Sequence, residues 1–292
     1  MKKIAQILLF SVFPLYVSAQ SVSPEVIATA GDYFENSSGS LSWTLGEVMT
    51  ETFSSGGNIL TQGFQQPFVV RISLDLVFFL EGPYNGSGMD TWLNDASKIP
   101  LTQPYNTLPW NYGGEESVGS IPLNTVDWVL IELRDAISAP AANASTIIAQ
   151  QAGFLMNDGS VISFDGSPNL QFGTTFHENL FIVVWHRNHL GIMSANPPSY
   201  YNGIYSYDFS SAASQVYGGS TGYKMMPSGT WVTPAGDGIN DGIINILDLS
   251  LWEYNAGTQG YKSVDYNLDV QVNNHDKNDK WVHNQSYIST IP

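Results

Sequence analysis

The amino-acid sequence predicts a mainly β protein: an immunoglobulin-like β-sandwich, preceded by a short β appendage and followed by a small α-helical module. Three observations lead to this prediction. Aromatic residues make up 13% of the chain and charged residues only 12%, so the helix formers Glu, Lys and Arg are scarce. Short apolar runs separated by Gly, Pro and Asn turns fill the middle of the sequence. Asp and Asn dominate its last part.

The start of the chain, residues 1–19, has the pattern of a secretory signal peptide. Lys2 and Lys3 precede an apolar run, and Ala19 is the small residue expected before a cleavage site. The apolar run is shorter than the ~20 residues that a membrane-spanning helix needs, and no later segment is long enough. We therefore expect a secreted protein without a transmembrane segment, located extracellularly or at the cell surface, with the periplasm as the alternative.

The negative charge of the chain limits the partners that it can bind. The chain has 26 acidic and 10 basic residues, a net charge of −16, and no cysteine. Such a surface repels phosphate backbones, which excludes nucleic acid as a partner, and it attracts divalent cations. Because no disulfide can form, a bound metal ion is one way to stabilise a small exported module.

Residues 20–70 are predicted to form the β appendage. The segment 41–45 alternates between apolar and polar residues, Gly46 and Glu47 make a turn, and residues 48–53 are expected to pair back on the first strand.

Residues 71–233 are predicted to form the sandwich, because short strands alternate there with Gly, Pro and Asn turns. Asn157, Asp158 and Gly159 give a hairpin signal. The predicted strands are Leu74–Leu80, Trp128–Leu133, Ile147–Met156, Ser160–Phe164, Leu180–His186, Gly191–Met193 and Gly203–Phe209.

A long stretch between residues 81 and 124 is rich in Pro, Gly, Tyr and Trp. Either it is a functional loop or it contains further strands. Its aromatic residues either cap the sandwich core or stack on sugar rings. They are Trp92, Tyr105, Trp110 and Tyr112.

Residues 234–292 form the last predicted part, and they contain a repeat. A shift of 28 residues superimposes two segments rich in Asp and Asn. Alternate positions of a tight loop can point six to eight oxygens at one hard cation, so the spacing predicts Ca²⁺. The predicted ligands are Asp237, Asp241, Ile243, Asn245 and Asp248 in loop one, and Asp265, Asn267, Asp269, Gln271, Asn273 and Asp276 in loop two.

The two loops differ in the residue at position 3. Position 3 is Asn267 in loop two but Ile239 in loop one, where Asn240 lies one place further along. A bend at Gly238 could bring Asn240 into the site. Ile243 and Gln271 would act through their backbone carbonyls, and position 9 through water. We predict two calcium sites, the first weaker.

The repeat resembles the type I dockerin repeat, in which two F-hand loops are each followed by a helix. The match covers residues 237 to about 284, with Val270 in place of a glycine. The resemblance implies a cohesin-like partner. Positions 10 and 11 carry Ile246-Leu247 and Asn274-His275 instead of the Ser/Thr pair of cellulosomal dockerins. The alternative partner is the chain's own β domain, contacted through apolar residues of the module. These are Leu249, Leu251, Trp252 and Trp281.

A second resemblance is to secreted modular surface proteins described as hemagglutinin-like. It rests on segments 26–31, 45–47, 60–67, 79–84, 126–134 and 185–190. This resemblance implies adhesion at the cell surface and gives no catalytic residues. It leaves surface glycans as possible ligands.

Catalytic motifs are weak. In a strand, His186 and His189 would point to opposite faces and could not share one metal unless the strand ends between them, so we expect a structural role, with Arg187 paired to Glu132 or Asp127. A glycosidase needs two facing carboxylates, and nothing selects a pair among Glu81, Asp90, Glu115, Glu116, Asp127 and Glu132. We predict a non-catalytic adhesion or binding protein. The alternatives are a carbohydrate-binding or carbohydrate-degrading component of a polysaccharide-utilisation system, such as a glycoside hydrolase accessory component, and a structural surface subunit.

Overall fold

The computed structural model describes residues 30–36, 39–45, 52–55, 58–61 and 71–292. The contacts divide the chain into two compact units, residues 1–68 and 69–292. The predicted signal peptide lies outside the described residues. The predicted sandwich (71–233) and terminal module (234–292) both lie in the second unit.

The first unit contains two hairpins. Strand β1 (Ala30–Asn36) pairs antiparallel with β2 (Gly39–Leu45), and β3 (Thr52–Ser55) with β4 (Asn58–Thr61). Residues 41–45 were expected to pair with residues 48–53. They pair with β1 instead, and residues 52–53 pair with β4, while residues 48–51 lie outside the described residues.

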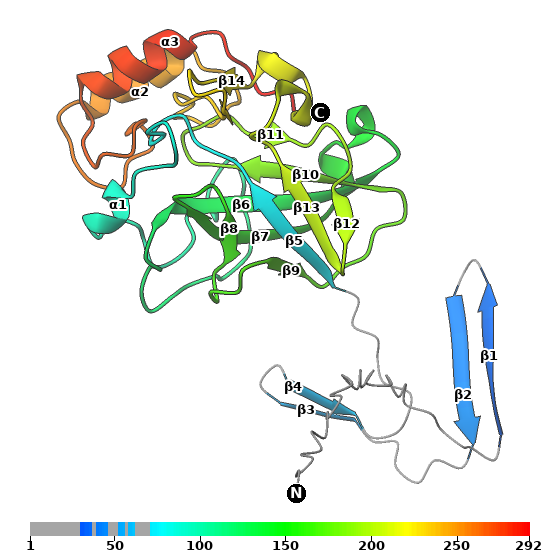
Figure 1. Ribbon diagram of the computed structural model, residues 1–292. Coiled ribbons are helices and arrows are strands. Elements are labelled where there is room, and N and C mark those ends of the chain that lie inside the picture. The colour runs from blue at the N-terminus through cyan, green and yellow to red at the C-terminus, as the bar shows by residue number, and fades with distance from the viewer. Residues whose placement is uncertain (1–29, 37–38, 46–51, 56–57, 62–70) are drawn as a thin grey trace, which may run out of the picture. The chain divides into compact units, whose positions relative to one another are not determined.

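The second unit is built from two main sheets, and the predicted mainly β class is confirmed (Figure 1). One sheet has the strand order β11-β10-β6-β7-β8 and the other β12-β13-β5-β9. All neighbours are antiparallel except β5 and β13. The strands are β5 (Ile72–Val77), β6 (Thr125–Ala136), β7 (Ile147–Met156), β8 (Val161–Ser163), β9 (Leu170–Phe172), β10 (Asn179–Trp185), β11 (Ile192–Met193), β12 (Ser199–Tyr201) and β13 (Ile204–Asp208).

The local sequence explains these strands. Ile72, Leu74 and Leu76 are buried at alternate positions of β5, the period-two pattern of a strand with one apolar face. Residues 125–134 of β6 are buried on both faces, and the charged residues Asp127, Glu132 and Arg134 within this run have to find polar partners there. The hairpin predicted at residues 157–159 connects β7 to β8, and Gly159 supplies a left-handed φ of 89° there.

Between residues 81 and 124 the structure contains one short helix, α1 (Trp92–Asp95), and no strand. The side chain of Tyr105 is fully buried in the sandwich core, and its hydroxyl donates a hydrogen bond to the Trp128 carbonyl (2.7 Å). Trp110 and Tyr112 pack against the same core, whereas Trp92 is 43% exposed. Three of the four aromatic residues therefore contact the core, Trp110 and Tyr112 with only part of their surface.

Short elements complete the second unit. Two 3₁₀ turns, at 139–141 and 144–146, lie between β6 and β7, and two more, at 213–215 and 219–221, follow β13. Strands β14 (Lys224–Met225) and β15 (Trp231–Val232) then form a two-stranded ribbon. Each Asp-rich loop is followed by a helix: α2 (Ile246–Asn255) after loop one, and a π-helical turn η5 (Asp276–Trp281) leading into α3 (Val282–Asn284) after loop two. In Figure 1, α2 and α3 lie side by side beyond the ends of the sheets.

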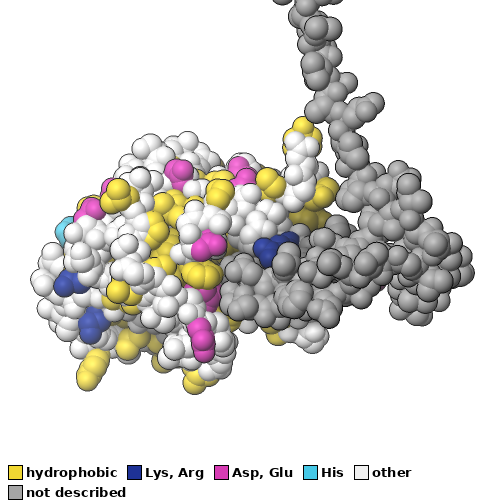
Figure 2. Space-filling view, turned by 90° about the horizontal axis from the view of Figure 1, so that it is seen from below, with side chains coloured by type: hydrophobic (Ala, Val, Ile, Leu, Met, Phe, Trp, Pro, Cys, Tyr) yellow, Lys and Arg dark blue, Asp and Glu magenta, His cyan; other side chains and the backbone are white. Residues whose placement is uncertain are grey.

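Among the described residues, none of the helices has the length and apolar character needed to cross a membrane. Among the described side chains visible in Figure 2, basic ones are few and stand apart from one another.

Candidate metal-binding loops and their junction with the sandwich

The two loops have the same hydrogen-bond pattern, shifted by 28 residues. In each loop, the carboxylate at position 1 (Asp237 or Asp265) accepts the N–H groups of positions 5 and 6. The carboxylate at position 12 (Asp248 or Asp276) accepts the N–H groups of positions 3 and 9. The side chains at positions 5 and 9 accept the N–H groups of positions 7 and 11. Six bonds therefore repeat in register.

The carboxylates at positions 1 and 12 are buried: Asp237, Asp248, Asp265 and Asp276. Within residues 71–292, none of them forms an ion pair with a basic side chain. Burial, together with repulsion from the other carboxylates, raises the pKa of Asp237 to about 7 and that of Asp276 to about 6. Burial also raises the pKa of Asp265 to about 7, although Arg187 acts in the opposite direction. A cation bound in the loop would favour the ionised form of these carboxylates.

Backbone geometry keeps Ile239 at position 3 of loop one. Asn240 (φ 60°) and Leu268 (φ 62°) occupy the same left-handed position 4 in their loops, so the predicted bend that would bring Asn240 into the site is absent. The next left-handed position is Gly242 in loop one (φ 82°) but Val270 in loop two (φ 79°). A β-branched residue in that region is strained by about 1–2 kcal/mol.

The donors fit a hard cation. Asp and Asn side chains and backbone carbonyls supply only oxygen. In the part of the chain that the structure describes, no three His, Cys, Asp or Glu side chains converge closely enough to hold a metal by themselves. A cation in either loop would therefore also draw on amide oxygens, the carbonyl of Ile243 or Gln271, and water.

The loops pack around a small apolar core. Ile244 and Val272, both at position 8, are buried there beside Leu190 of the sandwich. The helix of each repeat reaches the opposite loop: Trp252 Nε1 donates to the Asn273 carbonyl (3.2 Å), and Trp281 Nε1 donates to the Asn245 carbonyl (2.9 Å). Position 9 of each loop is thus held by the helix of the other repeat.

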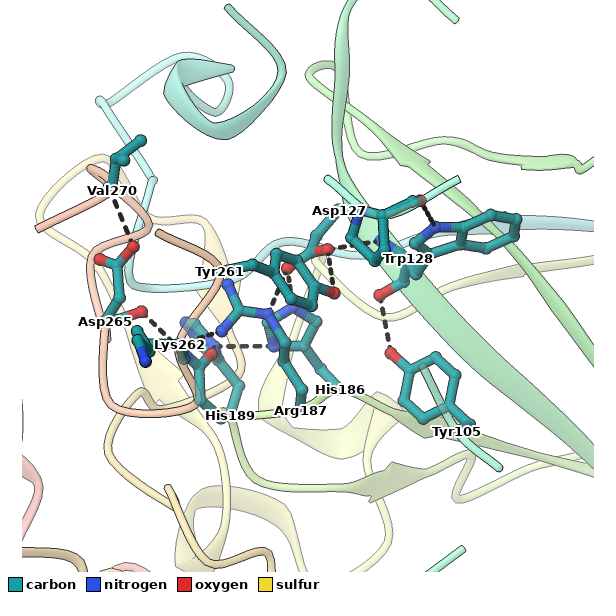
Figure 3. Close-up of polar contacts among 12 residues, drawn as sticks. Tyr105, Asp127, Trp128, His186, Arg187, His189, Tyr261, Lys262, Asp265 and Val270 are labelled. Atoms are coloured by element: carbon teal, nitrogen blue, oxygen red, sulfur yellow. Dashed lines mark hydrogen bonds and ion pairs between the residues drawn. The ribbon is translucent and has the colours of Figure 1, made fainter. Parts of the chain in front are cut away.

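A buried polar junction joins loop two to the sandwich (Figure 3). At its centre, the Asp127 carboxylate accepts hydrogen bonds from Arg187 Nε (2.8 Å), the Tyr261 hydroxyl (2.7 Å) and the Trp128 N–H (2.8 Å), and it contacts His186 Nε2 (3.2 Å). Burial alone would raise its pKa, but Arg187 and His186 bring the pKa of Asp127 down to about 2. The carboxylate is therefore ionised and fully occupied.

The residues Arg187, Asn188 and His189, which follow β10, extend this junction. The Arg187 guanidinium lies 4.0 Å from the Tyr261 ring centre and donates through Nη1 to the Lys262 carbonyl. Asn188 Nδ2 donates to the Asp265 carbonyl (2.6 Å), which belongs to position 1 of loop two. His189 Nε2 accepts the Gly82 N–H (2.9 Å). Segment 186–189 therefore anchors the module.

The structure confirms the predicted Arg187–Asp127 pair. It corrects the expected orientation of the two histidines, because β10 ends at Trp185 and the alternation of side chains stops there. The Nδ1 atoms of His186 and His189 lie 3.0 Å apart. Burial lowers the pKa of both imidazoles, so these side chains are neutral within the junction.

A second polar contact surrounds Glu81. Its carboxylate accepts hydrogen bonds from Lys224 Nζ (2.6 Å), from the Ala235 N–H (3.0 Å) and from Asn284 Nδ2 in α3, while its carbonyl accepts Lys280 Nζ (3.1 Å). The terminal helix is thereby fixed to the loop that follows the first strand of the sandwich.

Five of the six candidate glycosidase carboxylates are engaged by other side chains, among them Asp90, which accepts Asn85 Nδ2 (2.9 Å). Asp127 is saturated, Glu81 is paired with Lys224, and Glu132 is paired with Arg134 (2.7 Å). Glu116 accepts the Tyr112 hydroxyl (2.5 Å), and Glu115 is exposed.

Sequence reasoning did not identify Tyr261, Lys262 or Asn284 as junction residues. Their partners lie far away in the sequence, and no periodic pattern marks them. The run Trp185–His189 was the available signal, since a polar cluster directly after an apolar strand has to find partners when it is buried.

Replacing His189 by Leu is expected to lower the unfolding free energy by about 1–3 kcal/mol, because the buried Gly82 N–H loses its acceptor. Urea denaturation of the purified protein measures this. His283→Leu is the matched control, since His283 is exposed. A stoichiometric zinc or manganese ion that is lost in the His189 variant would contradict the structural role.

No protein-family model and no curated protein matches this sequence. Among solved structures, one similar chain comes from the crystal structure of a type II cohesin–X–dockerin complex of Acetivibrio cellulolyticus, an N-terminal interface mutant. The TM-score is 0.38 and the identity 11%, over 75% of this chain and 98% of that chain.

Proposed function

We propose that this chain is a secreted, non-catalytic binding protein whose paired terminal loops bind calcium and thereby fix the module to the chain's own β-sandwich. The observation that carries the proposal is the set of six hydrogen bonds that repeats in register around four buried carboxylates. Two loops with the same Asx spacing and the same backbone pattern match the oxygen donors that calcium prefers.

Attachment of the module to its own chain is supported by the burial of the module's apolar residues. Trp252 and Trp281 are buried in the small core that includes Leu190, and Leu249 and Leu251 pack against it. Bound calcium would cancel the repulsion among the carboxylates, and the ordered loop two would present the carbonyls of Lys262 and Asp265 to the junction. The sandwich would then be the part that faces other molecules.

A second candidate function is binding of a cohesin-like module. It is favoured by the exposed apolar residues at positions 10 and 11 of loop one, Ile246 (63% exposed) and Leu247 (55%). Titration of a cohesin module into the protein and into an Ile246→Asp, Leu247→Asp variant tests it. If neither titration gives a heat of binding, this candidate is eliminated.

Calorimetry should resolve two calcium sites, the tighter one in loop two by at least about tenfold, since only loop two has an oxygen side chain at position 3. Asp276→Asn is expected to remove the tighter site and Asp248→Asn the weaker one. Ile239→Asn should tighten loop one. Glu115→Gln, an exposed carboxylate outside the loops, is the control. Loss of the tighter site in Asp248→Asn would contradict the assignment.

Calcium binding should release protons at pH 6, and the affinity should weaken as the pH falls below about 7. The metal-free carboxylates of Asp237 and Asp265 have pKa values of about 7, so they hold protons that the ion must displace. Calorimetry in two buffers of different ionisation enthalpy measures the protons released. Identical heats in both buffers would show that the carboxylates are already ionised without the metal.

A further inference from the structure

A cavity of about 610 Å³ lies within the second unit, away from the Asp127 junction. The indoles of Trp110 and Trp185 line it together with Ile147 of β7. Residues 240–243 of loop one form one wall, and the final segment 288–292 forms another. These two walls are joined, because the Ser289 N–H donates to the Gly242 carbonyl (2.8 Å). The volume is within the range of small-molecule sites, about 300–1,000 Å³.

The polar groups of the cavity are preorganised. Glu132 accepts Arg134 Nε at one carboxylate oxygen (2.7 Å) and Gln150 Nε2 at the other (2.8 Å). Arg134 Nη1 is held by the carbonyls of Ala142 (2.6 Å) and Pro292 (3.2 Å). Glu132 and Arg134 are each only 3% exposed. Their charges cancel, and Asp241 adds a negative charge at the wall, so the cavity has no excess positive charge for an anion.

One donor is left over. Trp110 Nε1 is buried and has no hydrogen-bond partner among residues 71–292. A buried donor without an acceptor is unfavourable by about 1–3 kcal/mol. Trp110 also lines the cavity, but its Nε1 is closed off from solvent, so the cavity offers a ligand the indole ring and not the indole N–H.

We propose that this cavity binds a neutral sugar residue of a glycan. Flat indole rings offer stacking surfaces to a pyranose ring, the Gln150 amide offers polar groups to hydroxyls, and the negative charge of Asp241 disfavours anionic sugars. The inference rests on the proposed function in one respect: loop one is a wall of the cavity, so its calcium occupancy should support sugar binding.

The test is a printed array of neutral and acidic glycans, probed with the full-length protein in calcium, followed by titration of the best neutral oligosaccharide with tryptophan fluorescence. Trp110→Ala should weaken binding by about tenfold or more, and Trp110→Phe should restore part of it. Ile147→Arg, at a site that is 37% exposed, should block the cavity without disturbing the core. The controls are Trp92→Ala and Ile137→Arg, both exposed and outside the cavity.

Binding of neutral glycans that both cavity variants lose and both controls keep is the expected result. The proposal is overturned if no glycan on the array binds, if binding is confined to acidic glycans, or if the cavity variants bind as well as the controls. It is also overturned if the cavity takes up only an apolar dye that sugars do not displace. Calcium titration of the same samples is independent of these outcomes, so failure of the sugar site and failure of the calcium sites are distinguishable.

Discussion

Chelation of calcium is expected to unfold residues 237–284 while the sandwich stays folded. At a calcium concentration a thousandfold above the dissociation constant, each site stabilises the folded module by about 4 kcal/mol. The module's own apolar core is small, and its four buried carboxylates repel one another when the ion is absent. The sandwich has a separate and larger core formed by both sheets.

Limited proteolysis shows whether residues 237–284 unfold when calcium is removed. In chelator, cleavage is expected shortly after Pro234 and should leave a resistant sandwich, whereas calcium should protect the whole second unit. Magnesium at equal concentration is the control, because it prefers a tight octahedral site to these flexible loops. If the tail stays protected in chelator, the Glu81 and Asp127 contacts hold the module without any ion.

Asp127→Asn is expected to lower the unfolding free energy of the second unit by about 3–5 kcal/mol. The substitution keeps the shape of the side chain but leaves the Arg187 guanidinium buried without its counter-charge. Chemical denaturation monitored by tryptophan fluorescence gives the value. Glu115→Gln makes the same chemical change at an exposed position and should have little effect. A loss below about 1 kcal/mol for Asp127→Asn would mean that water reaches the guanidinium.

The sequence predicted those features of the second unit that depend on local pattern. Seven predicted strands correspond to β5, β6, β7, β8, β10, β11 and β13, because alternation and turn residues mark them. Strands β9, β12, β14 and β15 were not predicted, since strands of two or three residues carry almost no periodic signal. The equally short β8 is marked instead by the turn residues 157–159 that precede it. The loop register followed from spacing alone, and it places equivalent residues in equivalent backbone positions.

The junction could not be predicted in the same way. Asp127 contacts Tyr261 across 134 positions of sequence, and Glu81 contacts Asn284 across 203. Such pairings are decided by how the module sits on the sandwich, which no local pattern encodes. The orientation of His186 and His189 depended on where β10 ends, and strand ends are the least predictable part of an element.

The reciprocal contacts of Trp252 and Trp281 should couple calcium binding in one loop to calcium binding in the other. Each indole belongs to the helix that begins at one loop, yet it holds the main chain at position 9 of the other. An ion that orders loop two fixes the helix carrying Trp281, and with it the Asn245 carbonyl of loop one. Calcium binding should therefore be positively cooperative, with the tight site preparing the weak one.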